Sequence, residues 1–246
     1  MKYDGTGYHG WQSQPNLEPT IQATIERVLK DFFKQDIRIQ GASRTDAGVH
    51  ALDQVMAFDL DHPISLDGLT KVLNKRLPNE IQVFNPSLVA NDFNPRFGGD
   101  GKYYVYRIYP SKQAHPILER FVWQISHPLD FEKMAQAGEV LMGVHHFKSF
   151  AASNAEYVSY EREIFHFSCQ KTQLFGEEIW EIRFGGSGFM KQMVRNLIGT
   201  LIEVARGHWP VEKVKQILDA QDRSKAGPTA PAKGLMLEKN LLEIKS

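Results

Sequence analysis

The stretch Arg44-Thr45-Asp46-Ala47-Gly48-Val49-His50 is the most informative part of this sequence of 246 residues. Small residues follow Asp46, so nothing bulky next to it in the chain shields its carboxylate oxygens. Gly48 permits a backbone with positive φ, which suits a loop that leaves a strand. Because rigid scaffolds often present reactive groups on such loops, Asp46 is a candidate reactive carboxylate. The alternative is that its side chain only closes an Asx-turn.

Composition is typical of an ordinary globular protein. Hydrophobic residues make up 42% and charged residues 24% of the chain, and no run of about 18 apolar residues predicts a transmembrane helix. The N-terminus lacks the apolar segment of a secretory signal. The single cysteine, Cys169, excludes an internal disulfide and a cysteine-based metal site, and its alternating apolar surroundings favour a packed thiol on a strand. We expect a cytoplasmic protein.

The charge balance does not by itself indicate a nucleic-acid partner. The chain has 29 basic and 29 acidic residues and a net charge of +0, whereas phosphate contacts normally supply most of the affinity for RNA. A neutral protein still binds RNA if its basic residues gather on one face. The candidates for such a face are Arg38, Arg44, Lys71, Lys75, Arg76, Arg96, Lys102, Arg107, Lys191 and Arg195.

Hydrophobic periodicity predicts two successive halves of mixed structure. The first half has helical spacing over residues 20–34 and 69–73, and the second over 131–142, 193–202 and 210–220. Strands are predicted at 1–3, 37–39, 54–60, 81–84, 103–109, 121–124, 163–169, 179–184, 235–237 and 241–244. Each half resembles a β-α-β-β-α-β unit, so we expect an α+β fold of two tandem ferredoxin-like domains, 1–109 and 110–246.

Five segments, in this order, resemble the tRNA pseudouridine synthase A (TruA) family. They are Tyr3-Asp4-Gly5-Thr6 with Tyr8-His9-Gly10-Trp11-Gln12; residues 41–51 around the heptapeptide; residues 93–97 with 104–109; residues 188–190 with 193–199; and residues 226–235. The resemblance implies two α/β domains with joined antiparallel sheets and a cleft between them. It further implies isomerisation of uridine to pseudouridine in the anticodon arm of tRNA, at positions 38, 39 and 40. A homodimer that needs neither metal nor organic cofactor is also implied.

The resemblance assigns roles to three residues. Asp46 is expected to be the nucleophile. Arg195 matches the arginine that pairs with this aspartate, although without the family it would read as a solvent-facing helix residue. Tyr106 matches the tyrosine that stacks on the extruded uracil and offers its hydroxyl near C5. A strand tyrosine can also simply pack in a sheet.

Two further residues are candidate substrate contacts. Arg44, beside the nucleophile, is expected to fill the space of the extruded base or to clamp a phosphate, and a surface salt bridge is the alternative. Leu235 matches a position that packs on the uracil, and a core leucine is the alternative. Two other functions stay open: a catalytically silent RNA-binding module, and an N-glycosidase that uses the same aspartate.

Overall fold

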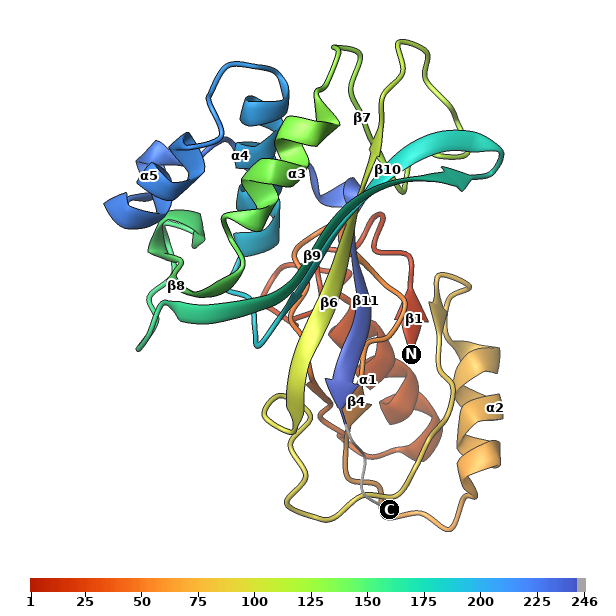
Figure 1. Ribbon diagram of the computed structural model, residues 1–246. Coiled ribbons are helices and arrows are strands. Elements are labelled where there is room, and N and C mark those ends of the chain that lie inside the picture. Colours follow the sequence, from red (N-terminus) through yellow and green to blue (C-terminus); the bar gives the residue numbers. More distant parts are fainter. Residues whose placement is uncertain (243–246) are drawn as a thin grey trace. The chain divides into compact units, whose positions relative to one another are not determined.

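The protein consists of two compact units. A computed structural model describes residues 1–242 (Figure 1). The first unit comprises Met1–Asp100 and the C-terminal segment from Met236 onward, and the second comprises Gly101–Leu235. The border therefore lies nine residues before the expected boundary after Tyr109, inside a long strand, and residues 236–242 belong again to the first unit.

Two helices of the first unit form where the apolar spacing predicts them. Helix α1 (Ile21–Phe33) begins at Thr20, whose hydroxyl accepts a hydrogen bond from the Ala23 amide at 3.2 Å. Its residues Ile21, Ile25 and Leu29 are spaced four apart and are fully buried. Helix α2 (Leu66–Arg76) is capped in the same way by the Ser65 hydroxyl, and its end precedes Pro78.

The strands in the N-terminal part of the first unit are short. The order of its main sheet is β5 (Ile81–Gln82), β1 (Lys2–Tyr3), β3 (His50–Ala51) and β11 (Leu235–Leu242). The β1–β3 and β1–β5 pairs are antiparallel and β3–β11 is parallel, while β2 (Gln40–Gly41) and β4 (Met56–Ala57) form a separate antiparallel pair. The sheet is thus mixed, because β11, from the C-terminal part of the chain, pairs parallel with β3 while the other pairs are antiparallel.

The strand expected at 37–39 does not form, although Ile37 and Ile39 are buried as the pattern requires. Two side chains of α1 bind the Ile39 backbone: Glu26 accepts from its amide at 3.1 Å and Gln22 donates to its carbonyl at 3.2 Å. The polar groups that a strand ladder would use are therefore bound to the helix. The strand expected at 54–60 is reduced to β4.

The second unit is built on longer strands. Its sheet has the order β6 (Gly99–Tyr109), β10 (Glu177–Gly186), β9 (Glu161–Leu174) and β8 (Gly143–His146), all antiparallel. The two-residue β7 (Trp123–Gln124) pairs parallel with β6. Arg107 of β6 lies opposite Glu181 of β10, and the two form an ion pair of 2.9 Å. Strands β6, β9 and β10 are each longer than the sequence predicts.

Helices of the second unit cover one face of this sheet (Figure 1). Helix α3 (Phe131–Glu139) packs on α4 (Met193–Ala205) and β9. Helix α3 stops three residues before the predicted end, and Gly143 with positive φ begins β8. Helix α5 (Lys213–Ala220) starts after a turn at Pro210 rather than at Pro210 itself. Three 3-10 turns complete the unit: η1 (Lys148–Phe150), η2 (Arg223–Lys225) and η3 (Ala232–Gly234).

The α+β class is confirmed. The two strands expected at 235–237 and 241–244 form the single strand β11, and the predicted end at Ile244 lies outside the described residues. Cys169 lies half-buried on β9, where burial raises the pKa of its thiol to about 11. Among residues 1–242, none of the helices has the length and apolar character that a membrane crossing requires. The joined sheets and the cleft between the domains stay predictions.

Truncating the apolar face of α1 tests the core of the first unit. Leu29→Ala should lower the free energy of unfolding by about 2–5 kcal/mol, because it leaves a cavity beneath a fully buried side chain. Leu88→Ala is the control, since Leu88 is 80% exposed and its truncation should change stability by less than about 0.5 kcal/mol. Urea denaturation measures both. Equal effects would contradict this assignment of the core.

Candidate functional site

Asp46 opens a tight turn. Its carbonyl accepts a hydrogen bond from the Val49 amide at 3.1 Å, and Gly48, the third residue of the turn, has a φ of 76°. That conformation favours glycine, as the sequence predicts. The Asp46 side chain is half-buried and Ala47 is exposed. The turn therefore holds a half-buried carboxylate that is followed in the chain only by small residues.

Hydrogen bonds from the start of the chain hold this turn in place. The Thr45 carbonyl accepts from the Trp11 amide at 3.1 Å, and the Gly48 amide donates to the Tyr8 carbonyl at 3.2 Å. The hydroxyls of Thr45 and Tyr3 share a further hydrogen bond of 2.8 Å. Residues on both sides of Asp46 are thus tied to residues 3–11, which explains physically why those two segments of the resemblance occur together.

Two glycines let the backbones approach closely. A Cβ on Gly10 would lie 2.7 Å from the Thr45 carbonyl oxygen, and one on Gly5 would lie 2.1 Å from the Val49 carbonyl oxygen. Both distances are shorter than side chains tolerate against a backbone. Only glycine therefore fits at these two positions beside the Asp46 turn.

His50 and Arg44 flank Asp46 but differ in surroundings. His50 is buried, and its Nδ1 lies 3.0 Å from both the Gly5 amide and Asp4 Oδ1, so it belongs to the packing of the first unit. Arg44 is exposed, as a phosphate contact requires. Two other candidate RNA-binding arginines, Arg38 and Arg107, form ion pairs with Glu26 and Glu181, which offset their charge.

Tyr106 lies in the middle of β6 and is fully buried. Its hydroxyl donates to the Pro231 carbonyl at 2.8 Å, and Trp123 contacts its ring edge-on. A Cβ on Gly234 would lie 2.7 Å from the ring, so the η3 backbone lies directly against it. Burial raises the pKa of Tyr106, and the nearby Arg195 guanidinium opposes that shift. The hydroxyl is therefore protonated at neutral pH.

Arg195 lies in the first turn of α4 and is half-buried. Its Nε donates to the Ala230 carbonyl at 2.7 Å, and the Ala230 amide donates back to the Arg195 carbonyl at 3.1 Å. Ala230 and Pro231 are adjacent in the chain. The structure thus brings Arg195 and Tyr106 together on two neighbouring carbonyls of one segment, which we call the 226–231 loop.

Polar residues of α4 that sequence reasoning missed bind this loop. Thr200 accepts from the Gly227 amide at 2.9 Å, and Asn196 accepts from the Thr229 hydroxyl at 2.7 Å. Gly199 lies between them, and a Cβ there would lie 1.6 Å from the Pro228 carbonyl oxygen. The sequence itself contains a sign of this contact. Two polar residues four positions apart, with a glycine between them, interrupt an apolar helical stripe, and this pattern indicates a close backbone approach.

The remaining candidates are placed as follows. Leu235 is buried at the start of β11, directly after η3. Asp46 and Arg44 belong to the first unit, and Tyr106, Arg195 and Leu235 belong to the second.

Replacing Gly10 tests the close approach beneath Asp46. Gly7 and Gly10 both have positive φ, of 80° and 89°, but nothing lies within 4 Å of a Cβ on Gly7. Gly7→Ala should cost only the conformational strain, about 1–2 kcal/mol. Gly10→Ala should lower the free energy of unfolding by more, because its Cβ also meets the Thr45 carbonyl. Equal losses in urea denaturation would show that the contact contributes nothing.

Comparisons with known proteins identify the family of this chain. A family model described as "tRNA pseudouridine synthase" matches residues 1–97 and 137–240. Three relatives, each named "tRNA pseudouridine synthase A", match over nearly the full length. The protein from Ligilactobacillus salivarius is 37% identical over 97% of this chain and 93% of its own. The one from Acetivibrio thermocellus is 39% identical over 96% and 95%, and the one from Myxococcus xanthus is 39% identical over 97% and 88%. With both the family model and these relatives matching most of its length, the chain belongs to the tRNA pseudouridine synthase family.

Proposed function

We propose that this protein is the enzyme that isomerises uridine to pseudouridine in the anticodon arm of tRNA, at positions 38, 39 and 40. Family membership supports the reaction. The observation that carries the proposal is the Asp46 turn, a half-buried carboxylate held by backbone contacts on both sides. Such a rigid presentation is what a nucleophile needs, since misplacement of a reacting group lowers the rate steeply.

The reaction requires few groups. The N1–C1′ bond breaks, the uracil rotates, and C5 joins C1′; the C5 proton leaves and N1 takes up a proton, so no redox change occurs. We assign the nucleophile to Asp46. A uridine paired in a stem must first leave the helix, at a cost of roughly a few kcal/mol. Because the reaction is redox-neutral and no group is added, it needs no organic cofactor.

Arg195 is proposed to stabilise the charge of the catalytic aspartate. Its Nε is bound to the Ala230 carbonyl at 2.7 Å, which sets the plane of the guanidinium. An arginine fork binds a carboxylate best when its plane is defined in this way. The arginine is also half-buried, so its electric field is less screened than that of a surface residue.

Tyr106 is proposed to stack on the uracil and to take part in removing the C5 proton. Because Gly234 lies against the ring, a uracil reaches it only if the Ala232–Gly234 turn moves. The neutral hydroxyl is a weak base. Proton removal through Tyr106 thus requires its oxygen to accept one proton while its own proton passes to a second acceptor.

Arg44 and Leu235 are proposed substrate contacts, Arg44 for a phosphate or for the space of the extruded base, and Leu235 for the uracil. We also propose that the protein acts in the cytoplasm as a homodimer on the anticodon stem-loop. These assignments follow the family resemblance, and the exposure of Arg44 supports the first of them.

Removing the charge of Asp46 tests the central assignment. Asp46→Asn should lower turnover by about 10⁴-fold or more, a loss on the scale seen when a nucleophile is removed, with little change in tRNA affinity. The control Asp59→Asn removes the same charge at an exposed position and should retain activity. The measurement is pseudouridine formed in unmodified tRNA. Substantial activity in Asp46→Asn would overturn the role of Asp46 as the nucleophile. For the wild type, release of free uracil would indicate an N-glycosidase, and the absence of any product would indicate a silent RNA-binding module.

Arg44→Ala should weaken tRNA binding and reduce the slope of log affinity against log salt by about 1, as the loss of one phosphate contact predicts. Lys112→Ala, at another exposed position, is the control and should leave the slope unchanged. Binding isotherms at several salt concentrations give both slopes. An unchanged slope for Arg44→Ala would remove Arg44 from the interface.

A further inference from the structure

We propose that Arg223 is a positioning residue for the reaction: it anchors the 226–231 loop on α4 and so sets the two carbonyls that hold Arg195 and Tyr106. The inference rests on the proposed function and extends it to a residue outside the expected site. Arg223 begins η2, and every contact that carries the argument lies within the second unit.

Both terminal nitrogens of Arg223 are engaged. Nη1 donates to the Gly227 carbonyl at 3.0 Å and more weakly to the Ala226 carbonyl at 3.4 Å. Nη2 donates to Asn196 Oδ1 at 3.0 Å and to the Thr229 hydroxyl at 3.1 Å. One planar guanidinium therefore joins the start of the loop, the middle of the loop and α4. Lysine lacks this fork geometry.

The helix side of this network is rigid. Asn196 is fully buried, and its Nδ2 donates to the Phe150 carbonyl at 2.8 Å, so its amide cannot turn freely. Its Oδ1 accepts from both Arg223 and Thr229. Because the acceptor is fixed and buried, removing either donor leaves polar atoms short of partners, which is costly inside a protein.

The network lies directly before the two functional carbonyls. Thr229 is followed by Ala230, which binds Arg195 Nε, and by Pro231, which binds the Tyr106 hydroxyl. Thr229 is the last anchored side chain before both carbonyls, so releasing it removes the nearest fixed point from which the Ala230 and Pro231 carbonyls are placed. The Ala232–Gly234 turn lies beyond the anchored residues and can move without breaking the contacts of Arg223.

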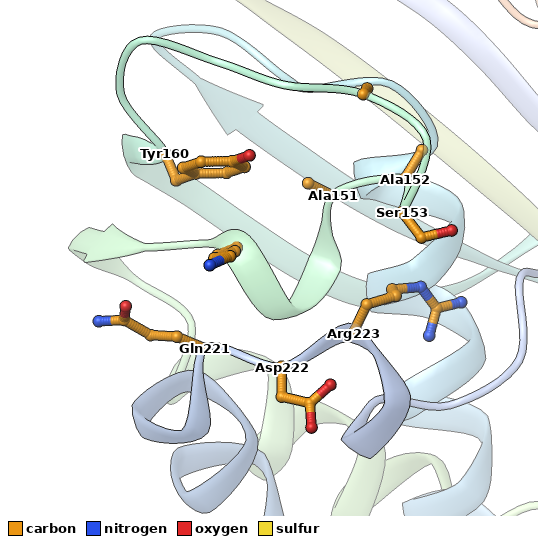
Figure 2. A pocket seen from close by; sticks show the side chains of 9 residues that line it. Ala151, Ala152, Ser153, Tyr160, Gln221, Asp222 and Arg223 are labelled. Carbon is orange, nitrogen blue, oxygen red and sulfur yellow. The ribbon is translucent and has the colours of Figure 1, made fainter.

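Arg223 also borders an open hollow of about 270 Å³ lined by Ala151, Ala152, Ser153, Tyr160 and Asp222 among others (Figure 2). An arginine beside a hollow suggests a different role, a direct phosphate contact with tRNA. Burial lowers the pKa of Arg223, and its terminal nitrogens already serve the loop and Asn196. These contacts favour positioning, and the two roles differ in their kinetic effects.

The first test compares Arg223→Gln with Lys225→Gln, a change of the same charge at an exposed position of the same turn. Arg223→Gln should lower kcat by about 10–100-fold, the effect of a misplacement near 1 Å, and leave KM for tRNA within about twofold. Lys225→Gln should leave kcat unchanged. Hydrogen exchange of the Gly227 and Ala230 amides should accelerate about tenfold or more in Arg223→Gln, because the released loop is no longer held against the Thr200 hydroxyl and the Arg195 carbonyl that these amides bind.

The second test uses Thr229. Thr229→Val keeps the shape but removes the hydroxyl that links Arg223 to Asn196, so it should reproduce the loss in kcat and the faster exchange. Thr229→Ser restores the hydroxyl and should rescue both. This pair decides the matter even if Arg223→Gln does not fold.

The outcomes separate the possible failures. A raised KM with unchanged loop exchange would overturn the proposal and indicate a direct tRNA contact at Arg223. Unchanged kcat in both Arg223→Gln and Thr229→Val, or no rescue by Thr229→Ser, would also overturn it. If the wild type forms no pseudouridine, the proposed function fails instead, whereas hydrogen exchange still reports whether Arg223 anchors the loop.

Discussion

Two hydrogen bonds are the constraint on which the second unit's part of the proposed site depends: Arg195 Nε donates to the Ala230 carbonyl, and the Tyr106 hydroxyl donates to the Pro231 carbonyl. They place a cation and a phenol, which come from a helix and a strand far apart in the sequence, on consecutive residues of one loop. That loop has no regular structure of its own at these residues. A backbone hydrogen bond from the Ala230 amide to the Arg195 carbonyl holds it at one point, and the side chains of Asn196 and Arg223 bind it at others.

The first unit uses a different device for the same purpose. Backbone contacts hold the Asp46 turn: the Trp11 amide binds the Thr45 carbonyl and the Gly48 amide binds the Tyr8 carbonyl. Gly10 allows those backbones to approach. Of the two residues next to Asp46 in the chain, only Thr45 adds a side-chain hydrogen bond, which its hydroxyl shares with that of Tyr3. In the first unit mainly backbone hydrogen bonds hold the proposed site residues, and in the second unit side chains contribute as well. Both restrict motion, as accurate placement in the proposed reaction would require.

The parts that could be predicted from the sequence are those with local causes. Ile21, Ile25 and Leu29 have the spacing of a helix face, and α1 follows it. The strand expected at 37–39 failed because side chains of α1 bind the Ile39 backbone, a contact that no local pattern reports. Asp46, Tyr106 and Arg195 were predicted as site residues mainly through the family resemblance, and their roles stay predictions. The sequence does not point to Arg223, because its proposed role depends on four hydrogen-bond acceptors. Three of these acceptors are on the loop and one is on α4, and only the folded chain brings them together.

Release of the C5 hydrogen tests the account most directly, because joining C5 to C1′ must free that hydrogen whatever the covalent route. A tRNA transcript labelled with tritium at C5 of its uridines should release one tritium for each uridine present at positions 38, 39 and 40. A transcript in which cytidine replaces those uridines should release none, and Asp46→Asn should release none from either transcript. Tritium release that persists in Asp46→Asn, or uracil set free with its label retained, would contradict the account.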